Sequence, residues 1–261
     1  MAGSLFHHVI DSEDAQRALA EAERQAALPA DQIDLSAMTI EQRPERYSEQ
    51  DHEVWRTVFR RRMAELPEDG SRVFLDGMAA IGLTDERVPS LDYVNTLLEP
   101  KTGWRSVAVP GYLPPRSFFA FLARRQFPTT ISIRPLDRLE YLPEPDILHD
   151  VFGHVPLHAD PVFADFLQIY GPTALEVNGE QASEGLARLF WFTVEFGLIR
   201  EGGEPKLYGA GLMSSPGEGR HALRSPDVDR RPFDLDTVLA TAFEIDHYQP
   251  ILYVLESFEE L

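Results

Sequence analysis

Helical spacing of apolar residues runs through most of the chain and constrains its fold more than any other feature. In SEQDHEVWRTVFRRRMAEL, Ser48 and Asp51 match a capping box, and apolar residues then recur every three or four positions. The same spacing predicts helices in SLDYVNTLLEP, in RSFFAFLARRQF and in DPVFADFLQIYG, where Asp160 is the expected N-cap and Pro161 the first residue. We therefore expect a mainly helical protein.

The alternation of polar and apolar residues that is typical of strands is rare in this chain. It occurs in TTISIR, so we predict a strand at Thr129–Arg134. A long apolar helix is predicted to start at Ser183 and to stop at Gly202 and Gly203. The C-terminal residues add a further helix, a break at Pro250 and a final apolar segment. The predicted fold class is mainly α with a few short β-strands.

The first residues differ in composition from the rest. The stretch EDAQRALAEAERQAALPADQ is rich in alanine and in charged residues. We therefore predict that residues 1–45 form an acidic, Ala-rich arm, either a loose helix or a partly disordered segment. Residues 46–261 carry the regular apolar pattern and are predicted to form a single catalytic domain.

The charge of the chain is strongly negative. Its 261 residues carry a formal net charge of −19 at pH 7, which disfavours nucleic acid or an anionic membrane as a partner. The absence of cysteine excludes disulfides, thiolate metal sites and cysteine nucleophiles. The N-terminal residues lack the features of a secretory signal, and no apolar run reaches membrane-spanning length. These observations predict a cytoplasmic protein.

Two histidines lie close together in PEPDILHDVFGHVP. His149 and His154 are five residues apart, which on an ideal α-helix of about 3.6 residues per turn separates them by about 140°. We expect Gly153 and Pro156 to end the helix, so that His154 turns back toward the face of His149. Neutral imidazoles are common ligands of iron, zinc, copper and nickel. Considered alone, the pair fits a metal site about as well as it fits one buried core histidine and one histidine that caps a helix end.

Glu195 is a single carboxylate within the apolar run LFWFTVEFGLI. Burying an unpaired carboxylate costs several kcal/mol, and a divalent cation shared with the two histidines would offset that cost. The alternatives are a salt bridge to an arginine or exposure to solvent. Two histidines and one carboxylate form the facial triad of non-haem iron(II) oxygenases, but zinc hydrolases also use two histidines and a glutamate. The HExxH spacing of the zincins is absent, which favours iron over a zinc hydrolase.

A second triad can be read just downstream. His158 and Asp160, with the distant His221 and Arg231, resemble the HxD…H pattern of the 2-oxoglutarate oxygenases. That pattern belongs at the end of a strand in a double-stranded β-helix. Here the surrounding pattern is helical, and Asp160 is better explained as an N-cap.

Several long motifs together resemble one enzyme family. PEPDILHDVFGHVPLHADPVFADF, RLFWFTVEFGL and YGAGLMSS are similar to the catalytic domain of the pterin-dependent aromatic amino acid hydroxylases, and most similar to the bacterial phenylalanine 4-hydroxylases. The likeness continues through VAVPGYLPPRSFFAFLARRQFPTTISIR and IDHYQPILYVLESFEEL and begins near Tyr47. It implies the single-domain catalytic fold of this family. It leaves no room for the regulatory domain or tetramerisation helix of the animal members, so a monomer is expected.

The resemblance also implies roles for individual residues. The iron ligands are His149, His154 and Glu195. Arg134 falls where an arginine binds the carboxylate of the amino acid substrate, and a guanidinium suits that group because it forms two parallel hydrogen bonds. Ser214 falls on the substrate side of the site, where a serine supports the first iron histidine.

Further positions face the organic ligands. Trp191 falls in the wall of the substrate ring pocket, and Ile245 falls in a loop near that ring, where an aliphatic residue is typical of phenylalanine hydroxylases. Leu142 replaces a threonine that contacts the substrate in animal enzymes. The positions that fall on the pterin site are Gly111, Leu113, Phe118, Asp150, Ala187 and Phe190. Phe118 is the ring expected to stack on the cofactor, and Phe190 replaces a frequent tyrosine.

The activity implied by the resemblance is a monooxygenation of the ring of L-phenylalanine to tyrosine. It uses O₂, iron(II) and a tetrahydropterin, either tetrahydrobiopterin or a related pterin, which supplies two electrons. Tryptophan hydroxylation and phenylalanine 3-hydroxylation are the alternatives within the family. Outside it, the alternatives are a zinc hydrolase and an aromatic amino acid binding protein without turnover.

Overall fold

Two helices begin where their capping residues predict. The computed structural model describes residues 8–139, 145–245 and 247–261. Helix α2, Glu49–Met63, starts at Ser48, whose side chain and that of Asp51 form the predicted capping box. Helix α7, Pro161–Glu176, starts at Asp160, which accepts the N–H of Phe163. Both boundaries confirm the sequence-based expectation, because a local side-chain bond to the first turn defines them.

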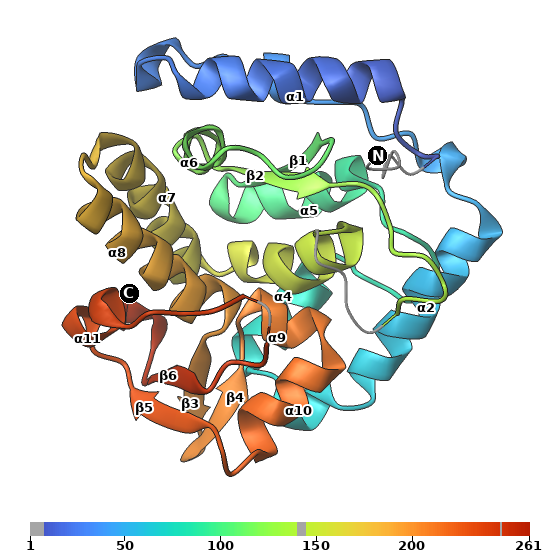
Figure 1. The fold of residues 1–261 in the computed structure, drawn as a ribbon. Helices are drawn as coiled ribbons and strands as arrows, with labels where there is room; N and C mark the ends of the chain where they lie inside the picture. The colour runs from blue at the N-terminus through green and yellow to red at the C-terminus, as the bar shows by residue number, and fades with distance from the viewer. Residues whose placement is uncertain (1–7, 140–144, 246) are drawn as a thin grey trace.

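The remaining elements are helices and short strands, and the strands all follow α5 (Figure 1). The other α-helices are α1 Ser12–Ala26, α3 Leu66–Asp69, α4 Arg72–Ala80, α5 Leu91–Thr102, α6 Pro115–Leu122, α8 Glu180–Phe190, α9 Ala210–Ser214, α10 Pro216–Arg224 and α11 Leu235–Ala240. The strands are β1 Arg105–Val109, β2 Gln126–Thr130, β3 Leu198–Glu201, β4 Glu204–Leu207, β5 Asp229–Pro232 and β6 Ile251–Leu255. The fold is therefore mainly α with a few strands, as predicted.

The strands form two small sheets. Strands β1 and β2 are parallel, and a four-stranded sheet has the order β4-β3-β6-β5. The strand predicted at Thr129–Arg134 is wrong in its position, because β2 ends at Thr130. Its partner β1 ends at Val109, and the chain beyond β2 bonds elsewhere: Ser132 accepts the N–H of Ile147.

The long helix predicted from Ser183 to the glycine pair is also wrong. Helix α8 passes into a π-helical turn, η6 Trp191–Glu195, and the chain then forms strand β3. Gly197 lies between η6 and β3, and only glycine fits there, since a Cβ atom would lie 2.1 Å from the ring of Tyr208. Gly202 and Gly203, with φ of 60° and 91°, make the turn between β3 and β4.

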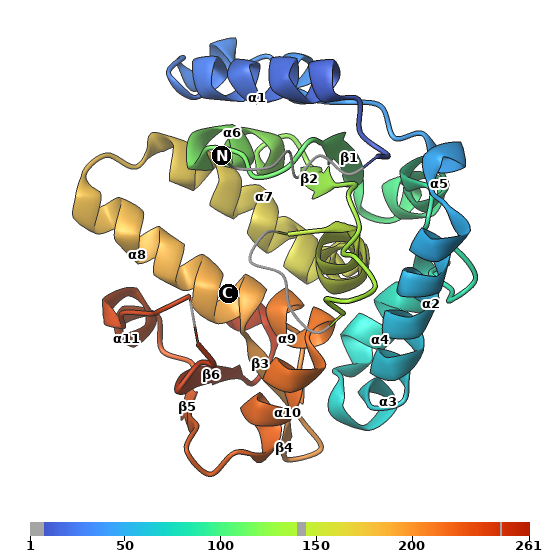
Figure 2. The same cartoon turned by 45° about the vertical axis from the view of Figure 1, so that its right-hand side comes forward.

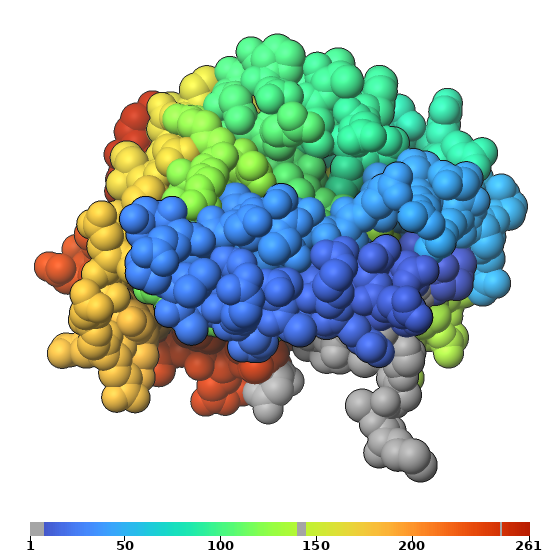
Figure 3. All heavy atoms as spheres, turned by 90° about the horizontal axis from the view of Figure 1, so that it is seen from above, coloured from blue at the N-terminus to red at the C-terminus, as the bar shows by residue number. Residues whose placement is uncertain are grey.

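Helix α1 lies along the outside of the molecule, over α6 (Figures 1 and 3). It belongs to the segment expected to be a loose helix or disordered arm, but Ala15, Ala18 and Ala22 on its inner face are fully buried. The carbonyl of Ala22 accepts a 2.6 Å hydrogen bond from Ser117 of α6. The N-terminal helix is thus packed against the body of the protein.

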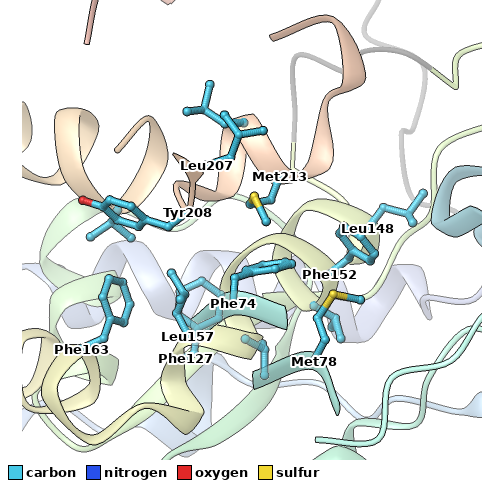
Figure 4. Close-up of a cluster of buried hydrophobic side chains, with 14 of the residues drawn as sticks. Phe74, Met78, Phe127, Leu148, Phe152, Leu157, Phe163, Leu207, Tyr208 and Met213 are labelled. Atoms are coloured by element: carbon cyan, nitrogen blue, oxygen red, sulfur yellow. The ribbon is translucent and has the colours of Figure 1, made fainter. Parts of the chain in front are cut away.

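Residues 148–159 lie near the middle of the molecule, between α2 and α4 on one side and α7 and α8 on the other (Figures 1 and 2). Leu148 and Phe152 pack among Phe74 and Met78 of α4 and Met213 of α9 (Figure 4). The segment that carries the two histidines is therefore held by core packing. Within the described residues, no helix is long and apolar enough to cross a membrane.

Candidate metal and pterin site

A π-helical segment, η4 Leu148–His154, carries the histidine pair. The helix does not end at Gly153, as the sequence suggested. Instead its turns widen to i→i+5 hydrogen bonding, which places residues five apart on one face. The Nε2 atoms of His149 and His154 lie 3.1 Å apart. Gly153 allows close packing on α9, because a Cβ atom there would lie 2.9 Å from the carbonyl oxygen of Ala210.

The second π-helical turn, η6, brings Glu195 to the same point. Its carboxylate oxygens lie 3.5 Å from Nε2 of His149 and 3.3 Å from Nε2 of His154. Two donor atoms that are each about 2.1 Å from one cation, at right angles to each other, lie about 3 Å apart. The three separations match three adjacent ligand positions around one ion, which is the arrangement of a facial triad.

The protonation behaviour of these groups reflects their contact. Burial alone would raise the pKa of Glu195, but the two imidazoles outweigh it and lower that pKa. Burial alone would lower the pKa of His149, but the Glu195 carboxylate outweighs it and raises that pKa. Close negative charge and convergent imidazoles are the setting that a divalent cation needs.

Asp150 offers another carboxylate at this place. Among the described residues, the ligand atoms of His149, Asp150 and His154 lie within 4.8 Å of one another. However, one carboxylate oxygen of Asp150 already accepts the N–H of Thr130 at 2.6 Å. Burial raises the pKa of Asp150 to about 6. Glu195 contacts both imidazole nitrogens and is therefore the stronger third donor.

Hydrogen bonds hold His149 at both its backbone and its ring. Its N–H donates to Asp146 at 3.0 Å, and its Nδ1 lies 3.1 Å from the hydroxyl oxygen of Ser214. The single hydroxyl proton of Ser214 is donated to the carbonyl of Ala210 at 2.8 Å. The ring of His149 must therefore donate its Nδ1–H to Ser214, which leaves the Nε2 lone pair directed at the cluster.

Arg134 is buried and its guanidinium is paired. Its Nε and Nη2 atoms donate to the two carboxylate oxygens of Asp146, at 2.9 and 2.8 Å, and Nη1 donates to the carbonyl of Leu139. Burial opposes ionisation of Asp146, but Arg134 outweighs it and lowers the pKa of that carboxyl. Asp146 thus connects the predicted substrate arginine to the backbone of His149.

The predicted ring-pocket residues have different surroundings. Trp191 stacks on Phe243 with ring centroids 4.5 Å apart, and its indole N–H donates to Gln249 at 3.0 Å. Ile245 is 68% exposed, so its side chain does not form part of a closed wall here. Leu142 lies outside the described residues.

Phe118 and Phe190, predicted at the pterin site, contact each other edge to face at 5.6 Å. Leu113 is buried, and Ala187 of α8 is exposed. Gly111 has no atom within 4 Å of the position that a Cβ would occupy. The aromatic pair and the open space beside Gly111 are each compatible with a flat heterocyclic ligand.

The alternative triad finds no support. Asp160 caps α7, while the ring of His221 packs against Tyr248. In the part of the chain that the structure describes, His158, Asp160 and His221 do not form a group able to hold one ion.

Comparisons with known proteins agree with this geometry. A family model described as "Biopterin-dependent aromatic amino acid hydroxylase" matches residues 38–261. The chain belongs to this family. Among curated relatives of the hydroxylase, the phenylalanine-4-hydroxylase of Ralstonia nicotianae is 46% identical over 85% of this chain and 71% of its own length. That of Chromobacterium violaceum is 41% identical over 87% of this chain and 77% of its own length.

Solved structures of the C. violaceum phenylalanine hydroxylase resemble this hydroxylase closely. One, with iron(III) and 7,8-dihydrobiopterin bound, has a TM-score of 0.83 and 42% identity, and covers 85% of this chain and 81% of that chain. Another, with iron and phenylalanine bound, has a TM-score of 0.81 and 39% identity, and covers 92% and 86%. The mainly helical fold is thus that of a phenylalanine hydroxylase catalytic domain.

Sequence reasoning missed Asp146 and Gln249 of this hydroxylase. Asp146 accepts the N–H of the residue three positions later, as a helix cap does, so its place before an apolar run was an available signal. Gln249 gave no such signal, because its link to Trp191 joins positions far apart in the sequence.

Proposed function

We propose that this protein is an iron(II)- and tetrahydropterin-dependent monooxygenase that converts L-phenylalanine to tyrosine with O₂. The observation that carries the proposal is the convergence of His149, His154 and Glu195 on one point, with atom separations of 3.1 to 3.5 Å. The names of the relatives support phenylalanine as the substrate. The family match favours this function over a zinc hydrolase.

In this proposal the three convergent side chains would hold the iron, and three protein ligands would leave room for other ligands. When bound, iron(II) and the tetrahydropterin supply the activation of O₂ and two electrons. Ser214 keeps the Nε2 lone pair of His149 directed at the metal through the hydrogen bond at Nδ1. The burial of His154, whose side chain is 4% exposed, keeps water away from that side of the centre.

Arg134 is proposed to bind the substrate carboxylate. The Asp146 carboxylate fixes the plane of its guanidinium by two hydrogen bonds, so the arginine is preorganised before the amino acid arrives. Trp191, held by Gln249 and Phe243, is proposed to line the space for the substrate ring. The metal ligands fix the position of the metal, and Arg134 fixes the carboxylate of the substrate. Together they orient the ring of the substrate toward the metal.

The pterin is proposed to lie against Phe118, with Gly111, Leu113, Asp150, Ala187 and Phe190 around it. Phe118 supports this role because its neighbour Phe190 holds it edge to face. We further propose that residues 46–261 form the catalytic unit and that the N-terminal segment braces it. The chain is proposed to act as a cytoplasmic monomer, and light scattering of the purified protein tests the oligomeric part.

Product analysis tests the function. The purified protein is loaded with iron(II), supplied with tetrahydrobiopterin and O₂, and given phenylalanine, tryptophan and tyrosine at equal concentration. We expect 4-hydroxylated phenylalanine as the main product, with tryptophan used less and tyrosine least. A 3-hydroxylated product, or preferred use of tryptophan, would identify another member of the family. Metal-dependent hydrolysis without pterin oxidation would contradict the proposal.

A further inference from the structure

Arg62 is a buried cation that the proposed reaction does not use. It lies in the last turn of α2, its side chain is 1% exposed, and burial lowers its pKa to about 10, which leaves it charged at neutral pH. A buried guanidinium is costly unless its N–H groups are paired. The groups that accept its hydrogen bonds therefore indicate what Arg62 stabilises.

The partners of Arg62 lie mainly at the end of α9. Its Nε donates to the carbonyl of Met213 at 2.7 Å, and its Nη2 donates to the carbonyl of Leu212 at 3.1 Å. Helix α9 has only five residues, so its last carbonyls lack partners within the helix. Arg62 supplies donors and a positive charge at this C-terminus, where both are favourable.

The next residue of α9 is Ser214, which receives the Nδ1–H of His149. Arg62 thus bonds the two carbonyls immediately before the residue that orients a metal ligand. Gly219 leaves space for this arrangement, since a Cβ atom there would lie 3.2 Å from Nη2 of Arg62. A continuous set of contacts runs from α2 through α9 to the metal cluster.

We propose that Arg62 is a positioning residue for the metal site, which fixes the end of α9 so that Ser214 holds His149 in its ligating orientation. This inference rests on the proposed function, because it requires His149 to bind the metal. It predicts that Arg62, which does not touch the ion or its ligands, contributes to the affinity for that ion. Replacing such supporting groups commonly weakens metal binding by about 10- to 100-fold.

Cobalt(II) is a suitable probe, because its absorption bands report its ligands without turnover. Dissociation constants are measured by competition with a chelator for the unmodified protein, Arg62→Met, Ser214→Ala and the double variant. We expect Arg62→Met to weaken cobalt binding by about 10-fold. The double variant should bind no more weakly than Ser214→Ala alone, because both changes remove the same support.

Arg220→Met is the matched control. Arg220 and Arg62 both donate to the carboxylate of Glu65, at 2.8 Å each, but Arg220 is half exposed and bonds no carbonyl of α9 among its described contacts. The Arg220→Met variant should bind cobalt with the same affinity as the unmodified protein. Arg62→Lys keeps the charge but lacks the planar guanidinium that bonds two carbonyls at once. It should therefore recover part of the cobalt affinity that Arg62→Met loses. It also serves as the test variant if Arg62→Met does not fold.

The outcomes separate the two proposals. If the unmodified protein binds no cobalt at the histidines, the proposed function fails. If it binds cobalt and the Arg62 variants bind equally well, the positioning role is wrong. Losses that multiply in the double variant would also overturn it, since they would show that Arg62 acts independently of Ser214.

Discussion

The side of the site proposed to hold the metal and the side proposed to face the organic ligands are built differently. On the metal side, His149 is held by Asp146 and by Ser214, and both histidines contact Glu195. On the other side, Tyr112 is 74% exposed, and Gly111 has open space beside it. The first side is formed by contacts within the chain, whereas we propose that the second is completed by its ligands. Changes on the first side should therefore remove activity, and changes on the second should adjust it.

Loss of a metal ligand is the strongest test of this difference. Glu195→Ala and His149→Ala each remove one of three proposed ligands, so we expect loss of stoichiometric iron and of turnover. Elemental analysis and phenylalanine-dependent tyrosine formation measure the two effects, with circular dichroism to confirm the fold. Normal iron content in either variant would remove that residue from the metal site.

Arg134→Lys tests the residue that bonds Asp146 and is proposed to bind the substrate carboxylate. Lysine keeps the charge but cannot form the planar fork, and hydrogen bonds to charged groups contribute about 1.5–3 kcal/mol each. We expect the KM for phenylalanine to rise by about 10- to 100-fold while the KM for the pterin changes much less. Steady-state kinetics with each substrate varied in turn measures both. An unchanged KM for phenylalanine would place the carboxylate elsewhere.

Arg116→Met tests whether the N-terminal segment supports the pterin side. Arg116 follows the Gly111–Pro114 loop and donates to the carbonyls of Ala26 and Leu28. Its loss should loosen the loop, so we expect the KM for the pterin to rise a few-fold and the KM for phenylalanine to stay nearly constant.

Arg124→Met provides the control for this experiment. Arg124 also reaches the N-terminal segment, through the carbonyl of Ala30, but it follows α6 and lies away from the loop. A rise in the KM for the pterin that is equal in both variants would show that the effect is not specific to the loop.

Ile245→Asp should have the smallest effect. An aspartate near the substrate ring would accept a hydrogen bond from a phenol hydroxyl and favour tyrosine. Because Ile245 is 68% exposed, water competes for that bond. Exposed polar interactions contribute at most about 1 kcal/mol, so we expect the preference for phenylalanine over tyrosine to fall by less than about fivefold. Competition assays with both amino acids measure it, and a larger change would show that the loop closes over the substrate.

The sequence predicted the elements that depend on local bonds. The starts of α2 and α7 follow from Ser48 with Asp51, and from Asp160, because each cap bonds its own first turn. The choice of His149, His154 and Glu195 also came from the sequence, by chemistry and by family resemblance. The structure brings these three side chains together.

Other features depend on contacts between distant segments and could not be predicted. In an α-helix, about 100° per residue would turn His154 about 140° away from His149. The π-helical turns instead place both on one face. Just after Glu195, where the helix is interrupted, Tyr208 packs closely against Gly197, and local periodicity does not report this contact. Arg62 would have been assigned to the surface, since arginine is rarely buried and its carbonyl partners lie some 150 positions away.

The wide turns of η4 have a consequence for how metal affinity is interpreted. An ordinary α-helix over residues 148–154 would turn the two imidazoles away from each other, so an ion bridging them binds only the π-helical form. Ion binding and helix type are therefore thermodynamically linked, and each stabilises the other to the same extent. A dissociation constant measured for this chain contains the conformational cost of the wide turns together with the strength of the metal–ligand bonds. Two relatives with identical ligands can thus differ in affinity through the helix alone.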